Sequence, residues 1–294
     1  MRRLSLAMVA GLLLLSLTSC TNSSDKTSPS TTTTSTTAAT STTAGPHGHN
    51  EHIKEGTGTK VKQYWIRGHY LSVGSNFVDE TKTPLGAGAV EALLGGAPRA
   101  DAISGMTTLI PEGTKLLGLD ISDGTATVDL SKEFVSGGGT MSMQVRTAQV
   151  VFTLTQFPSV NKVVFHIEGE EPEGLGGEGL PTTYTSREEF DDILPRILVE
   201  SPTPYQNTKS PITVAGMANV SADTVHWAIN TTEGSPLGNG SSKVTNKSPK
   251  GWASFEFQAK AKAYKGNVVL SVWEQDGEKE SDRTNIYDVL VNLT

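Results

Sequence analysis

Cysteine is almost absent from this sequence, because its 294 residues include only Cys20. A single thiol excludes a disulfide within the chain. Long apolar runs are equally scarce, and the one that exists, residues 4–17, is too short to span a bilayer stably. Positive charge is also in deficit, since the net charge is -7. An acidic chain of this kind argues against nucleic acid as a partner and against electrostatic docking on anionic lipids.

The start of the chain has the pattern of a secretory signal. Arg2 and Arg3 precede the apolar run, and small residues follow it. The last four residues of this segment resemble the bacterial lipobox, in which the cysteine is acylated and becomes the first residue of the mature chain: Leu17, Thr18, Ser19 and Cys20. The resemblance implies a signal peptide over residues 1–19 and a palmitate-type lipid on Cys20. The alternatives are an ordinary signal peptide with a chance cysteine and a retained membrane helix.

Lipidation of Cys20 would also account for the missing thiols. With Cys20 acylated, no free thiol would remain to oxidise outside the cell. Attachment to the membrane would then come from the lipid, since the acidic chain is not attracted to anionic head groups. The expected location is the outer face of the bacterial cell membrane.

Residues 20–59 are rich in Thr and Ser and contain almost no large apolar residue. Such a segment cannot bury enough apolar surface to fold, so we predict a disordered stalk carried by the lipid. It ends in a histidine cluster, His47, His49 and His52 with Glu51, which could ligate zinc or copper if the segment wrapped around an ion. Because no scaffold holds this geometry, we interpret the cluster as solvated linker and predict no metal and no cofactor.

Residues 60–194 have the pattern of a small α+β domain. A strand at 60–67 precedes a helix that begins at Thr83-Pro84 and ends at Gly95-Gly96. Two alternating segments flank Asp123-Gly124, which predicts a hairpin. A second helix follows, with Met141, Val145, Ala148 and Phe152 on its apolar face, and then a buried strand at 162–169. The order predicts a split β-α-β-β-α-β fold with two helices on one face of the sheet.

A short helix with a capping box, Ser186 and Glu189, leads into residues 195–294. Six segments there alternate between apolar and polar residues, and turn residues such as Glu233-Gly234 and Asn239-Gly240 separate them. This spacing predicts an immunoglobulin-like β-sandwich. The usual cysteine pair is missing, so we expect Trp227, Phe255 and Trp273 to fill the core.

The two predicted domains also resemble known families. Segments 87–94, 109–114, 126–131 and 151–160 are similar, in this order, to the sporulation and spore germination (GerMN) domain. Segments 194–202, 210–220 and 273–277 are similar to the immunoglobulin-like domain of bacterial spore germination. One departure is Ser221-Ala222-Asp223, which stands where the second family usually has an aromatic-acidic pair. A partner contact made by that pair would be altered here.

The resemblance implies a protein that acts through contacts with other proteins and not as an enzyme. We therefore expect a lipid-anchored scaffold or interaction module of the cell envelope, of sporulation or germination type. Its partner would be an envelope protein or a second copy of the chain. The alternative is a lipoprotein that binds peptidoglycan or another cell-wall glycan. Aromatic side chains that could stack on sugars are Trp65, Tyr70, Trp252 and Tyr264.

Enzymatic patterns are weak in this sequence. Ser159-Val160-Asn161-Lys162 matches S-x-x-K, but it follows a helix instead of starting one, and its partner motifs are missing. The acidic runs near 168–178 and 188–192 lack the alternation of a calcium loop, so we interpret them as solvated surface. A hydrolase would need a nucleophile beside a base, and the sequence offers no such pair.

Overall fold

The computed structural model describes residues 57–177 and 179–294. The elements before the predicted boundary at 194 are β1 (Thr59–Arg67), β2 (Tyr70–Val78), α1 (Leu85–Leu94), α2 (Arg99–Ile103), β3 (Leu116–Ser122), β4 (Thr125–Leu130), η1 (Lys132–Val135), α3 (Thr140–Leu154), β5 (Lys162–Ile167), β6 (Thr183–Tyr184) and η2 (Arg187–Ile193). Those after it are β7 (Ile197–Ser201), β8 (Asn207–Thr208), β9 (Ile212–Ala218), β10 (Thr224–Thr231), β11 (Pro236–Lys243), β12 (Ala253–Ala259), β13 (Gly266–Gln275), η3 (Glu280–Asp282) and β14 (Arg283–Leu293).

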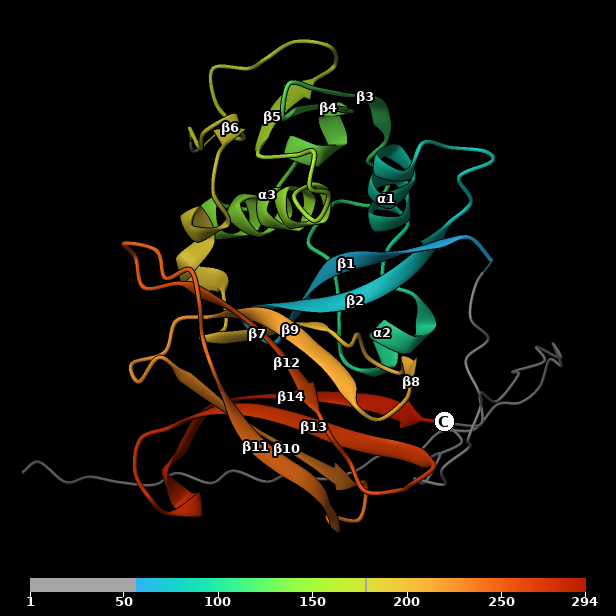
Figure 1. Cartoon of the computed structure of the whole chain (residues 1–294). Helices are drawn as coiled ribbons and strands as arrows, with labels where there is room; N and C mark the ends of the chain where they lie inside the picture. Colours follow the sequence, from blue (N-terminus) through green and yellow to red (C-terminus); the bar gives the residue numbers. More distant parts are fainter. Residues whose placement is uncertain (1–56, 178) are drawn as a thin grey trace, which may run out of the picture. The chain divides into compact units, whose positions relative to one another are not determined.

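The predicted fold class is confirmed: an α+β domain precedes a β-sandwich (Figure 1). In the first domain, α3 connects the parallel strands β4 and β5 in the sheet β3-β4-β5-β6. The predicted hairpin between β3 and β4 is confirmed. Asp123 and Gly124 have φ values of 49° and 78°, the left-handed pair that a tight hairpin turn requires.

The first strand differs from the prediction, because it is one half of a hairpin. β1 pairs with β2 in a two-stranded sheet of their own, outside the β3–β6 sheet. β2 reads YLSVGSNFV, and its Ser, Gly and Asn residues hide its strand character. The sequence therefore predicted one strand where the structure has two.

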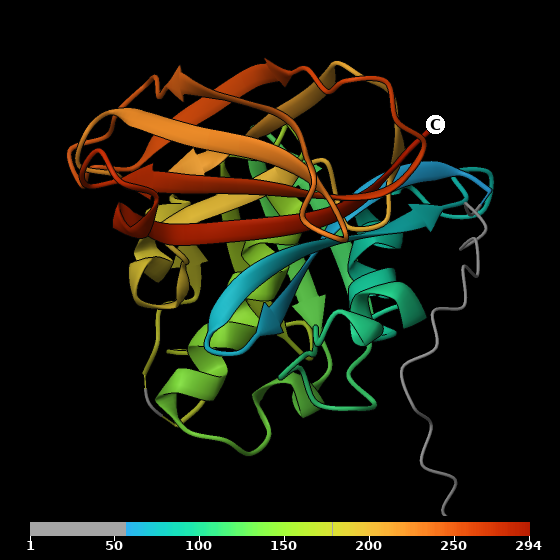
Figure 2. The same ribbon diagram turned by 90° about the horizontal axis from the view of Figure 1, so that it is seen from below.

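The β1–β2 hairpin lies between the helices of the first domain and the strands of the second (Figures 1 and 2). The outer edge of β1 pairs with glutamine side chains near the end of α3. Gln156 donates to the Lys62 carbonyl at 2.9 Å and accepts from the Lys62 N–H at 2.8 Å, and Gln149 donates to the Tyr64 carbonyl at 2.8 Å. These amides take the place of a neighbouring strand, so the edge is not left unpaired.

Helix α3 is buried on nearly all sides from Val145 to Leu154, because β1, α1 and η2 all pack against it. The predicted apolar face is confirmed for Val145, Ala148 and Phe152. Met141 is an exception, since it is 57% exposed in the first turn of the helix.

Arg146 of α3 fixes the glycine-rich entry to the helix. Its guanidinium is buried and donates to the carbonyls of Leu109, Phe134, Ser136 and Gly137 at 2.8–2.9 Å. No carboxylate takes part in these four contacts, so carbonyl dipoles alone accept from the guanidinium. The 137–139 loop is thereby tied to the segment before β3.

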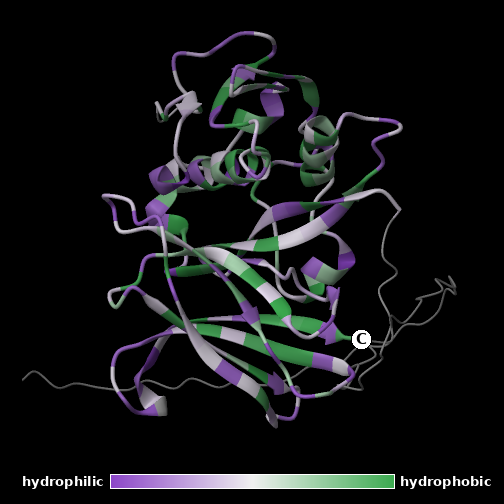
Figure 3. Cartoon of the chain, viewed as in Figure 1, coloured by the Kyte–Doolittle hydropathy of each residue, from purple (hydrophilic) through white to green (hydrophobic). Residues whose placement is uncertain are grey.

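The second domain is a sandwich of two sheets, β11-β10-β13-β14-β8 and β12-β9-β7. Apolar residues recur along its strands and along α1 and α3, whereas the connecting loops are mostly hydrophilic (Figure 3). Trp227 and Phe255 belong to the core, as predicted. Trp273 is also buried, at 5% exposure, but it lies on the outer face of its sheet, because its neighbour Val272 points inward.

Strand β11 was not predicted, and Asn239-Gly240 lies inside it instead of in a turn. Its glycines are explained by close packing. A Cβ on Gly240 would lie 2.8 Å from the Trp227 ring, and one on Gly238 would lie 2.2 Å from the Lys260 carbonyl oxygen. A sequence that resembles a loop is therefore a strand whose backbone approaches its neighbours closely.

The apolar core continues across residue 194, and the described residues 57–177 and 179–294 belong to one compact unit. The division into domains at 60–194 and 195–294 stays a prediction from sequence. The hairpin explains the continuity, since Tyr64, Trp65 and Val73 are fully buried where both halves pack.

We predict that the folded part unfolds in one transition. Separating the two halves would expose the buried hairpin, which makes independent unfolding costly. Differential scanning calorimetry should show a single peak whose calorimetric and van't Hoff enthalpies agree. Two resolved peaks would contradict the prediction.

Replacing Arg146 by Met should destabilise the protein by about 2 kcal/mol or more, because several buried carbonyls would lose their donor. Urea unfolding followed by circular dichroism measures this. The matched control is Lys132→Met, which removes an exposed cation from the neighbouring η1. Equal stabilities of the Arg146→Met and Lys132→Met variants would show that the hydrogen bonds of Arg146 to the four carbonyls contribute nothing to stability.

Candidate functional site

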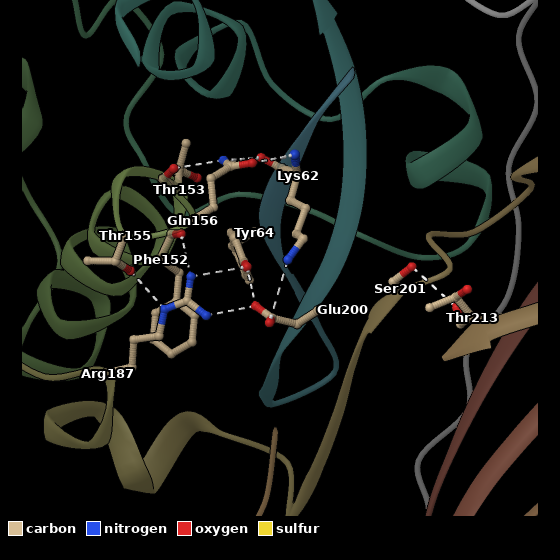
Figure 4. A network of polar contacts seen from close by, with 10 residues as sticks. All are labelled: Lys62, Tyr64, Phe152, Thr153, Thr155, Gln156, Arg187, Glu200, Ser201 and Thr213. Carbon is tan, nitrogen blue, oxygen red and sulfur yellow. Dashed lines mark hydrogen bonds and ion pairs between the residues drawn. The ribbon is translucent and has the colours of Figure 1, made fainter. Parts of the chain in front are cut away.

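The best-defined polar site in the described part of the chain is the junction between the two domains. Arg187 at the start of η2, Glu200 of β7, and Lys62 and Tyr64 of β1 meet there (Figure 4). These residues come from three elements that are far apart in the sequence. We call this group the junction cluster.

The local sequence sets the position of Arg187. Ser186 is the N-cap of η2, and its hydroxyl accepts from the Glu188 N–H at 3.1 Å. The Glu189 carboxylate accepts from the Ser186 N–H at 2.9 Å, which completes the predicted capping box. This cap fixes the first turn of η2, and Arg187 is the first residue of that turn.

The Arg187 guanidinium has partners on every side. It donates to the Glu200 carboxylate at 2.7 Å, to the Thr155 hydroxyl at 2.8 Å and to the Phe152 carbonyl at 3.1 Å. It also lies over the Phe152 ring, 4.7 Å from the centroid, and 5.4 Å from the Tyr64 centroid. Planar stacking combined with a charge-assisted hydrogen bond is an arrangement that lysine could not reproduce.

The Glu200 carboxylate accepts from the Tyr64 hydroxyl as well as from Arg187. The Lys62 ammonium lies 3.6 Å from its second oxygen. The side chains of Arg187 and Glu200 are 19% and 15% exposed, so the pair is largely removed from water. A buried carboxylate is tolerated here because cations face both of its oxygens.

Burial and charge act in opposite directions on the junction cluster. Burial would raise the pKa of the Glu200 carboxyl, but Arg187 and Lys62 outweigh it and hold this pKa below its usual value. Burial raises the pKa of the Tyr64 phenol well above its usual value. Around neutral pH the site therefore holds a carboxylate, a guanidinium and a neutral phenol.

The junction cluster is suited to fixing orientation and not to turning over a substrate. The guanidinium and the carboxylate are both occupied by partners within the protein. Removing one partner of such a buried pair leaves an uncompensated charge, so the pair favours one arrangement of the two halves.

Further polar contacts hold the junction along its length. Trp252 donates to the Asp191 carboxylate at 2.5 Å, and the hydroxyls of Ser72 and Tyr287 lie 3.1 Å apart. Lys60 donates to the Gln206 side chain at 3.0 Å. These contacts join η2, β2 and β1 to the sandwich at separate points.

Most residues that the sequence singled out for function lie outside the described residues. These are the lipobox-like residues Leu17, Thr18, Ser19 and Cys20, and the histidines His47, His49 and His52. Within 57–177 and 179–294, no group of three or more His, Cys, Asp or Glu residues is placed to hold a metal ion. No helix in this part has both the length and the apolar character needed to cross a membrane.

The aromatic residues considered for sugar stacking do not form one surface. Trp65 is fully buried and donates to Asp101 at 2.9 Å, and Trp252 is 3% exposed. Tyr70 is 50% exposed, and Tyr264 is half-buried. Two of the four are thus structural.

Sequence reasoning missed the junction cluster. The capping box marked the start of η2, but nothing in the sequence connects Arg187 with Tyr64, 123 residues away. The available signal was Glu200 at the end of the apolar segment ILVES, since a carboxylate beside a buried strand needs a partner.

The fold and the junction define a class of protein in which an α+β domain is joined to an immunoglobulin-like sandwich through a continuous core and a buried ion pair. Residues 62–173 match the family model described as sporulation and spore germination. Residues 196–280 match the model described as the immunoglobulin-like domain of bacterial spore germination. The chain therefore carries these two domains in this order.

Three solved structures are similar to parts of the chain. The first GerMN domain of the sporulation protein GerM from Bacillus subtilis is 28% identical, with a TM-score of 0.35, over 42% of this chain and 92% of that one. A Clostridium perfringens protein provisionally described as a lipoprotein is 23% identical, with a TM-score of 0.32, over 44% and 89%.

The tandem GerMN domains of the same Bacillus subtilis protein are 19% identical, with a TM-score of 0.37, over 69% of this chain. The chain spans 61% of the length of that tandem. No curated protein matches the chain.

We predict that Glu200 makes stability depend on pH. The pKa of the Glu200 carboxyl is lower in the folded protein than in the unfolded chain. Glu200 therefore contributes fully to the free energy of unfolding at pH values above its pKa in the unfolded chain. This contribution is lost as the pH falls through its pKa in the folded protein. Unfolding free energies measured in urea from pH 7 to pH 3 should fall more steeply for the wild type than for Glu200→Gln.

The matched control is Glu256→Gln, an exposed carboxylate on β12 of the same sandwich, which should follow the wild type. Replacing Arg187 by Met should cost about 3–5 kcal/mol at pH 7, because Glu200 would lose its main partner. Parallel pH curves for wild type and Glu200→Gln would contradict the assignment.

Proposed function

We propose that the chain is a lipid-anchored, non-catalytic protein of the bacterial cell envelope that acts as a scaffold through protein contacts. The observation that carries the proposal is the pairing of a sporulation and spore germination domain with the immunoglobulin-like domain of bacterial spore germination. The lipobox-like residues 17–20 support the anchor. The anchor would place the paired domains at the outer face of the cell membrane.

A fixed junction suits this role. A scaffold has to present its binding surfaces at constant spacing, and the junction cluster with its buried hairpin resists rotation of one half against the other. Because the two halves are already ordered relative to each other, little conformational entropy would be lost when a partner binds.

The distribution of exposed apolar residues supports a partner on the first domain. In the described part of the chain, six of the seven exposed large apolar side chains precede residue 194. The six are Tyr70, Ile103, Leu109, Leu117, Ile121 and Met141. Two of them, Leu117 and Ile121, lie on β3, an edge strand of the four-stranded sheet.

An exposed edge strand with apolar side chains is a site where another protein can add a strand or pack a helix. We propose that the β3 edge contacts an envelope protein or a second copy of the chain. Leu119 and Ile121 lie on the side of β3 that faces α1, since a Cβ on Gly86 would lie 3.3 Å from the Leu119 side chain and 3.0 Å from the Ile121 side chain. A partner there would extend the packing that α1 begins.

The anchor is tested by cell fractionation of wild type and Cys20→Ala in a bacterium that processes lipoproteins. The wild type should enter the membrane fraction, and Cys20→Ala should leave it. If the Cys20→Ala protein stayed in the membrane fraction, the anchor would be wrong.

The scaffold is tested by cross-linking in intact envelopes and recovery of the tagged chain. A cross-linked protein species should appear for the wild type and weaken at least severalfold for Leu117→Glu. The matched control is Ile286→Glu, which changes an exposed apolar residue of the second domain. Recovery of peptidoglycan fragments alone would overturn the proposal.

A further inference from the structure

The outer face of the five-stranded sheet carries a hollow of about 560 Å³. Its polar and aromatic lining comes from four strands: His226, Trp227 and Asn230 of β10, Asn239 and Ser241 of β11, Trp273 of β13 and Arg283 of β14. The volume lies in the range of about 300–1,000 Å³ that small-ligand sites occupy. Neither the junction cluster nor the β3 edge contributes to it.

Strand pairing explains why these side chains converge. His226 stands opposite Trp273 on one side and Ser241 on the other, and Ala228 stands opposite Asn239. His226, Ala228 and Asn230 alternate with the core residues of β10, so they share the outer face. Ala228 has a smaller side chain than His226 and Asn230 on either side of it, so the sheet surface is recessed at this position.

Trp273 forms a fixed wall of the hollow. The His226 ring stacks on it at 6.0 Å between centroids, and the Arg283 guanidinium lies 4.2 Å from its centroid. Its indole N–H donates to the Gln275 side chain at 2.9 Å. β10 and β14 flank β13, so the indole is held from both neighbouring strands. Side chains held in this way bind a ligand without losing further conformational freedom.

The chemistry of the lining selects the ligand class. Two carboxamides, a hydroxyl and an imidazole can donate and accept hydrogen bonds, and this mixture matches a surface of sugar hydroxyls. An apolar ligand would leave these groups unpaired, which is costly. A polyanion is disfavoured, because Arg283 is the single Arg or Lys among the lining residues and cannot balance several negative charges. The net charge of -7 on the chain would also repel a polyanion.

We propose that this hollow binds a neutral oligosaccharide. The carboxamides of Asn230 and Asn239 and the hydroxyl of Ser241 bind ring hydroxyls, and the imidazole of His226, which stacks on the buried Trp273, borders the sugar ring. The proposal does not depend on the scaffold function, since the hollow and the β3 edge lie on different domains.

The test uses the full-length chain in detergent, with tetra-N-acetylchitotetraose and cellotetraose as probes. Isothermal titration calorimetry should detect saturable binding of at least one probe with a Kd of roughly 0.1–1 mM. Two tryptophans, Trp227 and Trp273, line the hollow, so tryptophan fluorescence should change on binding, and the change should be smaller in Trp273→Phe, which keeps an aromatic wall.

The double variant Asn239→Leu/Ser241→Leu changes two exposed side chains of β11 and removes the hydrogen bonds that they would make to the oligosaccharide. It should weaken binding at least about tenfold. The matched control is Asp288→Leu, an exposed residue of β14 that does not line the hollow, and its Kd should stay within about twofold of the wild type. Circular dichroism confirms that each variant is folded. The absence of saturable binding for both probes, or equal binding by the double variant and the wild type, would overturn the proposal.

Discussion

The two halves of this protein depend on one buried hairpin, β1–β2, which belongs by sequence to the first half and packs against both. Its apolar residues are covered by α1 and α3 on one side and by the sandwich on the other. Its backbone edge is covered too, by Gln149 of α3 and by Gln156, which follows the helix. A hairpin alone is marginally stable in water, so this one requires both neighbours in order to persist.

The junction cluster gives that packing a direction. Apolar contacts tolerate small rotations, whereas the Arg187–Glu200 pair with its stacked rings is satisfied in one geometry. The charges contribute less to net stability than to the choice of arrangement, because desolvation offsets much of their attraction. A binding surface on either half, such as the β3 edge or the hollow beside Trp273, is therefore held at a fixed distance from the other.

Local signals in the sequence were sufficient for local structure. Asp123-Gly124 predicted a tight turn, and Ser186 with Glu189 predicted a capping box, because both features depend on a few adjacent residues. Long-range features could not be predicted in this way. Tyr64 and Glu200 are 136 residues apart, and a single sequence contains no sign that they meet. Strand β11 was missed because its glycines are required by Trp227 and Lys260, which only the folded chain brings close.

The position of β1 has a mechanical consequence. Force applied through the chain that precedes Thr59 enters the fold along β1, which is paired with β2 along its whole length. Force directed along the axis of β1 would load the nine residue pairs of that ladder together, in shear. Lys60 is also bound to Gln206, whose carbonyl accepts from the last strand at Asn292, so part of the load passes directly into the second half. The fold thus receives tension at a strand that both halves already hold.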